Sequence, residues 1–105
     1  MTGRPGVCVL ISGPGVTNAS TAIAEAYADS IPMLVISSAI PSAGLGRNWG
    51  YLHEISDQAA VTEPFVGSSH MVRSPDELPA LVAAAFSSFA SARPRPMHHS
   101  IPTDV

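Results

Sequence analysis

The chain has 105 residues and a formal net charge of −3, and its composition is 46% hydrophobic and 12% charged. These values are typical of one small globular domain, and the lack of a basic run argues against a nucleic acid or an anionic membrane as partner. All five basic residues are arginines, and charged residues are few for a free-standing domain. This low number suggests that other protein covers part of the surface.

The lone cysteine, Cys8, excludes an internal disulfide and fits a reducing compartment. No apolar stretch reaches the roughly 20 residues of a membrane span, and no signal-peptide pattern follows Met1. The expected location is the cytoplasm.

Two apolar runs flank an alanine-rich segment near the start of the chain. Residues 6–12 and 33–38 are continuously apolar or β-branched, which predicts strands covered on both faces, as in a parallel sheet. Residues 16–30 predict a helix whose apolar stripe includes Ala22, Ile23 and Ala28. Strand, helix and strand in this order predict a βαβ unit.

A polar, glycine-rich segment, residues 39–53, follows the second strand. Loops of this length inside compact domains are usually functional or disordered. Later patterns predict a short helix at 54–61, a strand at 65–72, a helix ending near residue 91 and a last strand at 97–101. Ser74, Pro75 and Glu77 predict the start of that last helix, with a capping box between the serine and the glutamate.

These elements predict an α/β fold, with helices on a mostly parallel sheet of about four strands and a single domain over residues 1–105. In such sheets ligands bind beyond the carboxyl ends of the strands. Residues 12–18 and 37–53 both follow predicted strands. Their shared position indicates a binding site at this edge.

The Gly13-Pro14-Gly15 turn has two interpretations. It can be a strand-to-helix turn that requires a glycine conformation, or it can allow backbone to approach a ligand near the helix amides. Asn18 can cap the helix or hydrogen-bond that ligand. The stretch matches neither a dinucleotide fingerprint nor a P-loop.

The histidines give weaker signals. His53 beside Glu54 could transfer protons, although such a pair on a loop is more often only solvated. His98 and His99 alternate across a strand, so they cannot face one metal, and with His70 they lack zinc-site spacing. No metal site is predicted.

Four segments together resemble the pyrimidine-binding domain of thiamine-diphosphate-dependent enzymes of the acetolactate synthase group: TGRPGVCVLISGPGVTN, AYADSIPMLVIS, SPDELPALVAAAF and RPRPMHHSIPTDV. The resemblance runs in register over essentially the whole chain. Two further segments, ADSIPMLVISS and LHEISDQ, are most similar to the 2-oxo-acid decarboxylase branch typified by 5-guanidino-2-oxopentanoate decarboxylase.

The resemblance assigns roles to residues of the turn and of the loop. In this family the Gly-Pro-Gly-x-Thr-Asn turn lies against the aminopyrimidine ring, which makes Gly13, Pro14, Gly15 and Asn18 the expected cofactor-binding residues. The family's Phe-Gln-Glu segment corresponds to residues 52–54, so His53 and Glu54 are expected near the substrate. A glutamine of the family's synthases falls at Ala39, a departure that counts against a strict acetolactate synthase.

Other parts of the family's active site have no counterpart in this sequence. The glutamate that hydrogen-bonds the pyrimidine belongs to a helix before the matched region, upstream of Met1, so no catalytic residue is assigned here. The diphosphate and Mg²⁺ belong to a separate domain with a Gly-Asp-Gly…Asn motif. FAD is carried by some relatives and is left open. The resemblance implies a homodimer or homotetramer whose active site lies between subunits.

The sequence is therefore expected to be the carboxyl-terminal two-thirds of a pyrimidine-binding domain, a segment of a thiamine-diphosphate-dependent 2-oxo-acid decarboxylase or carboligase. It is expected to be inactive in isolation. Two alternatives remain open, a non-catalytic remnant that serves as an oligomerising α/β module and a stand-alone anion- or nucleotide-binding domain. The substrate acid is not specified.

Overall fold

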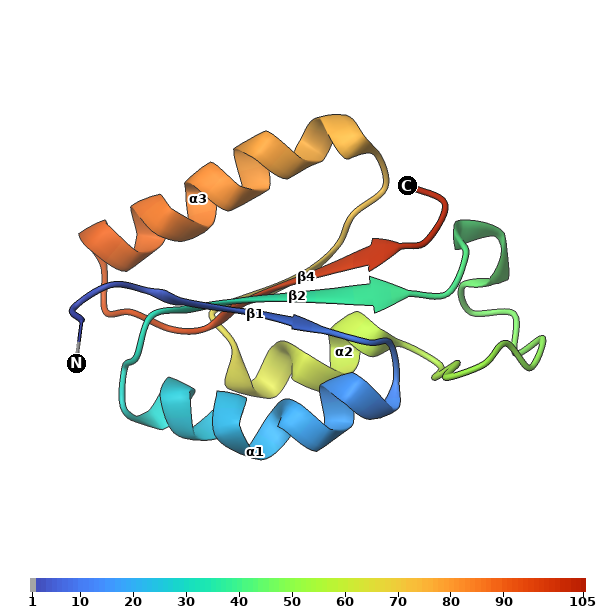
Figure 1. The fold of residues 1–105 in the computed structure, drawn as a ribbon, viewed down its shortest axis with the longest axis horizontal. Coiled ribbons are helices and arrows are strands. Elements are labelled where there is room, and N and C mark those ends of the chain that lie inside the picture. The colour runs from blue at the N-terminus through green and yellow to red at the C-terminus, as the bar shows by residue number, and fades with distance from the viewer. Residues whose placement is uncertain (1) are drawn as a thin grey trace.

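The computed structural model describes residues 2–105, whose four strands form one parallel sheet in the order β1–β2–β4–β3 (Figure 1). The elements are β1 (Gly6–Leu10), α1 (Pro14–Ala28), β2 (Met33–Ala39), α2 (Gln58–Thr62), β3 (Ser68–Met71), α3 (Leu78–Ser91) and β4 (Met97–Pro102). Helices α1 and α2 cover one face of the sheet, and α3 lies on the other. The predicted α/β fold is confirmed. No helix among the described residues is long and apolar enough to cross a membrane.

The α1 face of the sheet holds the apolar core. Ile23 of α1 packs with Val35 of β2 and Val66, which precedes β3. Ala22 and Ala28, which the sequence pattern placed on the apolar stripe of α1, are exposed instead. The reason is geometric, since the residues buried against the sheet follow the i, i+3, i+7 spacing of one helix face and these two alanines lie off it.

Strand β1 differs from its prediction because only one of its faces is covered. Val7 and Val9 are 57% and 75% exposed, whereas Cys8 and Leu10 contact the core on the α1 face. β1 is an edge strand, and α3 lies on the far side of the sheet without covering it. The continuous apolar run therefore identifies a strand, but among residues 2–105 nothing shields its second face.

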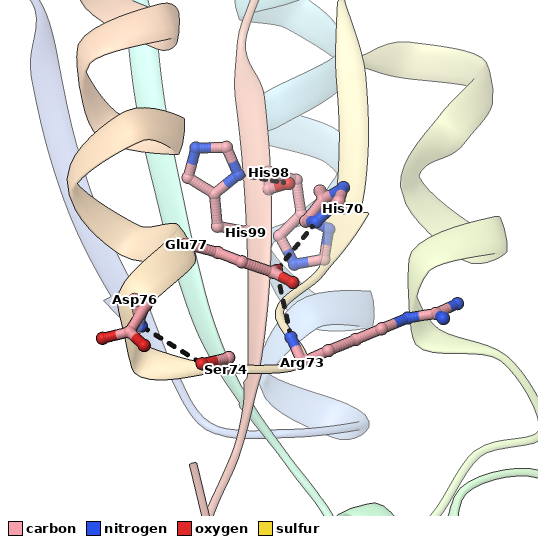
Figure 2. A network of polar contacts seen from close by, with 7 residues as sticks. All are labelled: His70, Arg73, Ser74, Asp76, Glu77, His98 and His99. Carbon is pink, nitrogen blue, oxygen red and sulfur yellow. Dashed lines mark hydrogen bonds and ion pairs between the residues drawn. The ribbon is translucent and has the colours of Figure 1, made fainter.

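The start of α3 is built differently from the predicted capping box. The Ser74 hydroxyl accepts a hydrogen bond from the Asp76 amide at 3.3 Å, within a short 3₁₀ turn at Pro75–Glu77. The Glu77 carboxylate accepts from the Arg73 amide at 3.2 Å and lies 3.4 Å from His70 Nε2 (Figure 2). The Arg73 amide, as the main cause, holds the pKa of Glu77 below its ordinary value. Glu77 thus stabilises the β3–α3 connection instead of completing a box with Ser74.

Polar side chains occupy the sheet interior under α2. His98 of β4 is fully buried on this face, while His99 points to the other side of the strand (Figure 2). His98 Nε2 lies 2.7 Å from Ser37 Oγ of β2, and His98 Nδ1 lies 2.8 Å from Thr62 Oγ1 of α2 and 3.0 Å from Ser69 Oγ of β3. Burial, reinforced by the neighbouring His99, lowers the pKa of His98 to about 4, so the ring is neutral at physiological pH.

His98 makes the stability of the fold sensitive to acid. Its pKa is about 4 when folded against an ordinary 6.5, so the unfolded chain takes up the proton first as the pH falls. The free energy of unfolding should therefore be highest above pH 6.5 and decrease towards pH 4. We expect a loss of about 2 kcal/mol at pH 5 relative to pH 8, measured by urea unfolding.

A His98→Gln variant removes the titrating ring and serves as the control. It should be less stable at neutral pH, because several buried hydroxyls lose their partner, but it should lose less stability between pH 8 and pH 5. An unchanged pH slope in this variant would assign the acid sensitivity to other groups.

Candidate functional site

A cavity of about 230 Å³ opens at the carboxyl ends of β1, β2 and β3, where the long loop after β2 returns to the sheet. Its lining combines apolar side chains with several hydrogen-bonding groups: Ser12, Ala39, Ile40, Leu45, Gly46, His53, Ile55, Ser56, Asp57, Gln58 and Met71. The position agrees with the edge that the sequence indicated, since both predicted segments meet there. A small molecule in this cavity would contact both apolar and polar groups.

The turn after β1 is held against the long loop. Gly13 has a φ of 55°, and a Cβ atom at this position would overlap the backbone carbonyl of His53. Only glycine fits here, because the conformation is left-handed and the contact is with backbone. The predicted strand-to-helix interpretation of this glycine therefore holds without any ligand. Gly15 is also restricted, since its Cβ would lie 2.7 Å from the Ile11 side chain.

Pro14 and Asn18 face outward. Pro14 is the first residue of α1, Asn18 follows one turn later, and both are exposed. Neither lines the cavity, although the turn that carries them adjoins Ser12, which does. Their assignment to a cofactor stays a prediction, and the structure leaves both side chains accessible for it.

His53 and Glu54 have separate environments. His53 lines the cavity from a left-handed backbone position, with a φ of 62°. The Glu54 carboxylate instead accepts hydrogen bonds of 2.5 to 3.2 Å from the backbone amides of Trp49, Gly50 and Tyr51. Glu54 therefore orders the loop that carries its neighbour, and of the two predicted substrate residues only His53 reaches the cavity.

Gln58 is the residue that the sequence analysis missed. It is only 5% exposed, its Oε1 accepts a hydrogen bond from the Gly13 amide at 2.7 Å, and its Nε2 lies within 2.9 Å of Ser37 Oγ, the Ser38 carbonyl and Ser100 Oγ. A single glutamine after a helix-capping Asp57 resembles an exposed helix start. The available signal was Ser37 in the otherwise apolar strand β2, because a buried hydroxyl requires a polar partner.

The charged side chains that line the cavity are of one sign. Asp57 is the only acidic residue of the lining, and no arginine lines the cavity in the described part of the chain. Asp57 caps α2 by accepting from the Ala60 amide at 3.0 Å. Ala39, where the resemblance expected a glutamine in relatives, lines the cavity, and Gln58 lines it from another element. Across residues 2–105 no group of three or more histidine, cysteine or acidic side chains is arranged to hold a metal ion.

Comparison with known proteins assigns this sequence to a family. The family described as "Thiamine pyrophosphate enzyme, N-terminal TPP binding domain" matches residues 1–61, which include the Gly13 turn, the long loop and Gln58. The match therefore covers both segments that border the cavity.

Curated relatives match over nearly the whole chain. A probable 2-ketoarginine decarboxylase, AruI, of Pseudomonas aeruginosa is 57% identical over 105 residues, 100% of this chain and 19% of that protein. An acetolactate synthase of Arthrospira platensis is 45% identical over 104 residues, 99% of this chain and 17% of that protein. The large subunit of acetolactate synthase isozyme 1 of Escherichia coli K12 is 39% identical over 103 residues, 98% and 18% respectively.

The chain thus spans about a fifth of the length of these relatives. The matched segment is shared by a decarboxylase and by synthases, and it carries the parallel sheet, the glycine turn and the adjoining cavity. The chain belongs to the N-terminal TPP-binding domain family of thiamine pyrophosphate enzymes, in its acetolactate synthase and decarboxylase-like group.

Proposed function

We propose that this chain is the thiamine-diphosphate-binding segment of a 2-oxo-acid decarboxylase or carboligase and has no turnover by itself. Family membership carries the proposal. The exposed face of the turn beside a partly polar cavity supports it, because these are the surfaces on which a ring and a small reactant can lie next to each other.

The exposed residues of the turn suit the cofactor's aminopyrimidine ring. Pro14 and Asn18 are four residues apart on α1 and therefore lie on the same face of the helix. Proline offers an apolar surface for a flat ring, while the asparagine amide can both donate and accept hydrogen bonds with ring nitrogens and the amino group. Gly13 and Gly15 contribute through the backbone path that places these two side chains.

The cofactor's diphosphate does not fit the residues of this chain. The cavity beside the turn carries the acidic Asp57 and no cation, so it would repel a diphosphate. We infer that the diphosphate and its Mg²⁺ are held by another domain and that the ring alone contacts this segment. The same charge argues against the stand-alone anion- or nucleotide-binding alternative.

When bound, thiamine diphosphate supplies an electron sink for decarboxylation of the 2-oxo acid. The residues of this chain bind and orient. The turn holds the ring, His53 presents an imidazole to the cavity as a hydrogen-bonding group, and Glu54 orders the loop around it. A partner subunit in a homodimer or homotetramer would complete the site.

The acidic cavity favours a substrate with a cationic end. A guanidinium group pairs well with a carboxylate, and Asp57 is the carboxylate at hand. A relative with 57% identity is named for 2-ketoarginine, a 2-oxo acid that ends in guanidinium. We infer that a 2-oxo acid of this kind is the substrate, with its tail towards Asp57.

Binding of thiamine diphosphate is the first test. Calorimetry on the full-length protein that contains this segment should detect binding of thiamine diphosphate but not of ATP. The Asn18→Ala variant should weaken the affinity by about tenfold, because one hydrogen-bonding side chain is lost while helix propensity improves.

Thr21→Ala is the matched control, since Thr21 is also exposed on α1 but lies one turn further from the cavity. It should leave the affinity unchanged. Binding of ATP in preference to thiamine diphosphate would refute the proposed function, and equal affinities of the Asn18 variant and the wild type would remove Asn18 from the site.

Asp57→Asn tests the substrate class. Asparagine caps a helix about as well as aspartate, so α2 should remain intact while the charge is lost. In the full-length enzyme that contains this segment, we expect KM for 2-ketoarginine to rise by roughly tenfold, because a charge-assisted hydrogen bond becomes neutral, while steady-state kinetics with pyruvate remain unaffected. A parallel change for both substrates would mean that Asp57 acts on the cavity as a whole and not on a cationic tail.

A further inference from the structure

We propose that Gln58 is a positioning residue that fixes the Gly13 turn, and with it Pro14 and Asn18, in the geometry that accepts the cofactor ring. The effect on cofactor binding rests on the proposed function. The claim that Gln58 holds the turn concerns only the hydrogen bond between α2 and the turn, so this claim and the effect on binding can be tested separately.

The contact with the turn is direct and buried. The backbone N–H of Gly13 donates to Gln58 Oε1 at 2.7 Å, and both residues are buried. Gly13 precedes α1 in a left-handed conformation, and no side chain of the turn caps this helix. The acceptor for the Gly13 amide therefore comes from a helix 45 residues further along the chain.

The orientation of the Gln58 amide follows from its partners. A backbone N–H can only donate, so the atom facing Gly13 must be the carbonyl oxygen. The amide nitrogen then faces the Ser38 carbonyl at 2.8 Å, Ser100 Oγ at 2.7 Å and Ser37 Oγ at 2.9 Å. Rotating the side chain by half a turn would set donor against donor at Gly13, which locks one rotamer.

Ser37 extends this lock to the buried histidine. The Thr62 hydroxyl donates to the Ala59 carbonyl at 3.1 Å, so its oxygen accepts from His98 Nδ1–H. His98 Nε2 lies 2.7 Å from Ser37 Oγ, and Ser37 Oγ accepts from Gln58 Nε2 at 2.9 Å. These contacts join His98 to the Gly13 amide through Ser37 and Gln58.

Removal of the Gln58 acceptor would change the conformation of the turn. A buried N–H without a partner is costly, and the turn can relieve this cost by moving its amide towards solvent. Such a shift would alter the start of α1, where Pro14 is the first residue and Asn18 follows. The expected consequence is weaker binding of the ring beyond what a loss of stability explains.

The experiment compares the Gln58→Met variant with the wild type, both in the full-length protein that contains this segment. Hydrogen–deuterium exchange measures residues 11–18, and calorimetry measures the affinity for thiamine diphosphate. Methionine has a similar length but no acceptor of comparable strength. We expect faster exchange at the turn and an affinity about tenfold weaker.

Two further variants separate positioning from general destabilisation. Val66→Ala creates a small cavity in the core without touching the turn, so it should lower the melting temperature and leave the affinity unchanged. Gln58→Glu, protonated in this buried position, keeps an oxygen for the Gly13 amide and an O–H donor for the Ser38 carbonyl, so it should retain slower exchange and a higher affinity than Gln58→Met.

The outcomes distinguish the two proposals. Unchanged exchange at residues 11–18 in Gln58→Met overturns the positioning role, whether or not the cofactor binds. Faster exchange with an affinity equal to that of Val66→Ala overturns the link to the cofactor. If the wild type itself fails to bind thiamine diphosphate, the proposed function and this link both fall, and exchange alone decides whether Gln58 holds the turn. Equal behaviour of Gln58→Glu and Gln58→Met contradicts a role for the acceptor oxygen.

Discussion

The hydrogen bond between the buried Gly13 amide and the Gln58 side chain is the contact on which the candidate site depends. It ties the start of α1 to α2, and through the other end of the same amide it ties α2 to β2 and β4. A second link at this edge is the hydrogen bond from the Ser12 amide after β1 to Ser38 Oγ of β2, at 3.0 Å. The Gln58 side chain joins the turn to both strands, and it does so beside the close contact of Gly13 with the His53 backbone.

This arrangement places polar groups where a sheet normally buries apolar ones. Ser37, Ser100 and His98 occupy the interior under α2, and the cost of burying them is offset only if every donor finds an acceptor. The neutral histidine satisfies this condition on the α2 side. On the opposite side His99 Nε2 lacks a hydrogen-bond partner within residues 2–105, and burial lowers the pKa of that ring as well. The α2 side is therefore the specifically organised face of the sheet.

Local pattern was enough to predict the elements but not what covers them. The apolar runs of β1 and β2 identified two parallel strands, and Pro14 marks the start of α1 two residues before the predicted boundary. The exposed second face of β1 could not be foreseen, since the same run occurs in edge and central strands. Glu77 was misassigned because its carboxylate reaches the Arg73 amide instead of the Ser74 amide, a choice that backbone geometry makes.

The candidate site was also predicted only in part. The glycines of the turn were found because they follow a predicted strand, and His53 was found from its position beside Glu54 and from the resemblance to the family. The structure joins them through the contact of Gly13 with the His53 backbone. Gln58 was not found because its importance arises from partners 20 to 45 residues away, and Asp57 was hidden by its ordinary role as a helix cap. Pairings across such distances leave no periodic trace in a single sequence.

The charge of the cavity limits the ligands that this segment could hold. Its cavity offers a carboxylate, an imidazole and amides, groups suited to a neutral ring or a cationic tail, but within the described residues it offers no cation for a diphosphate or a substrate carboxylate. Binding an anion there would cost desolvation without compensation. Under the proposed function, the anionic parts of cofactor and substrate would be bound by groups outside this chain. The part that this chain contributes is shape and hydrogen-bond direction, held by Gln58.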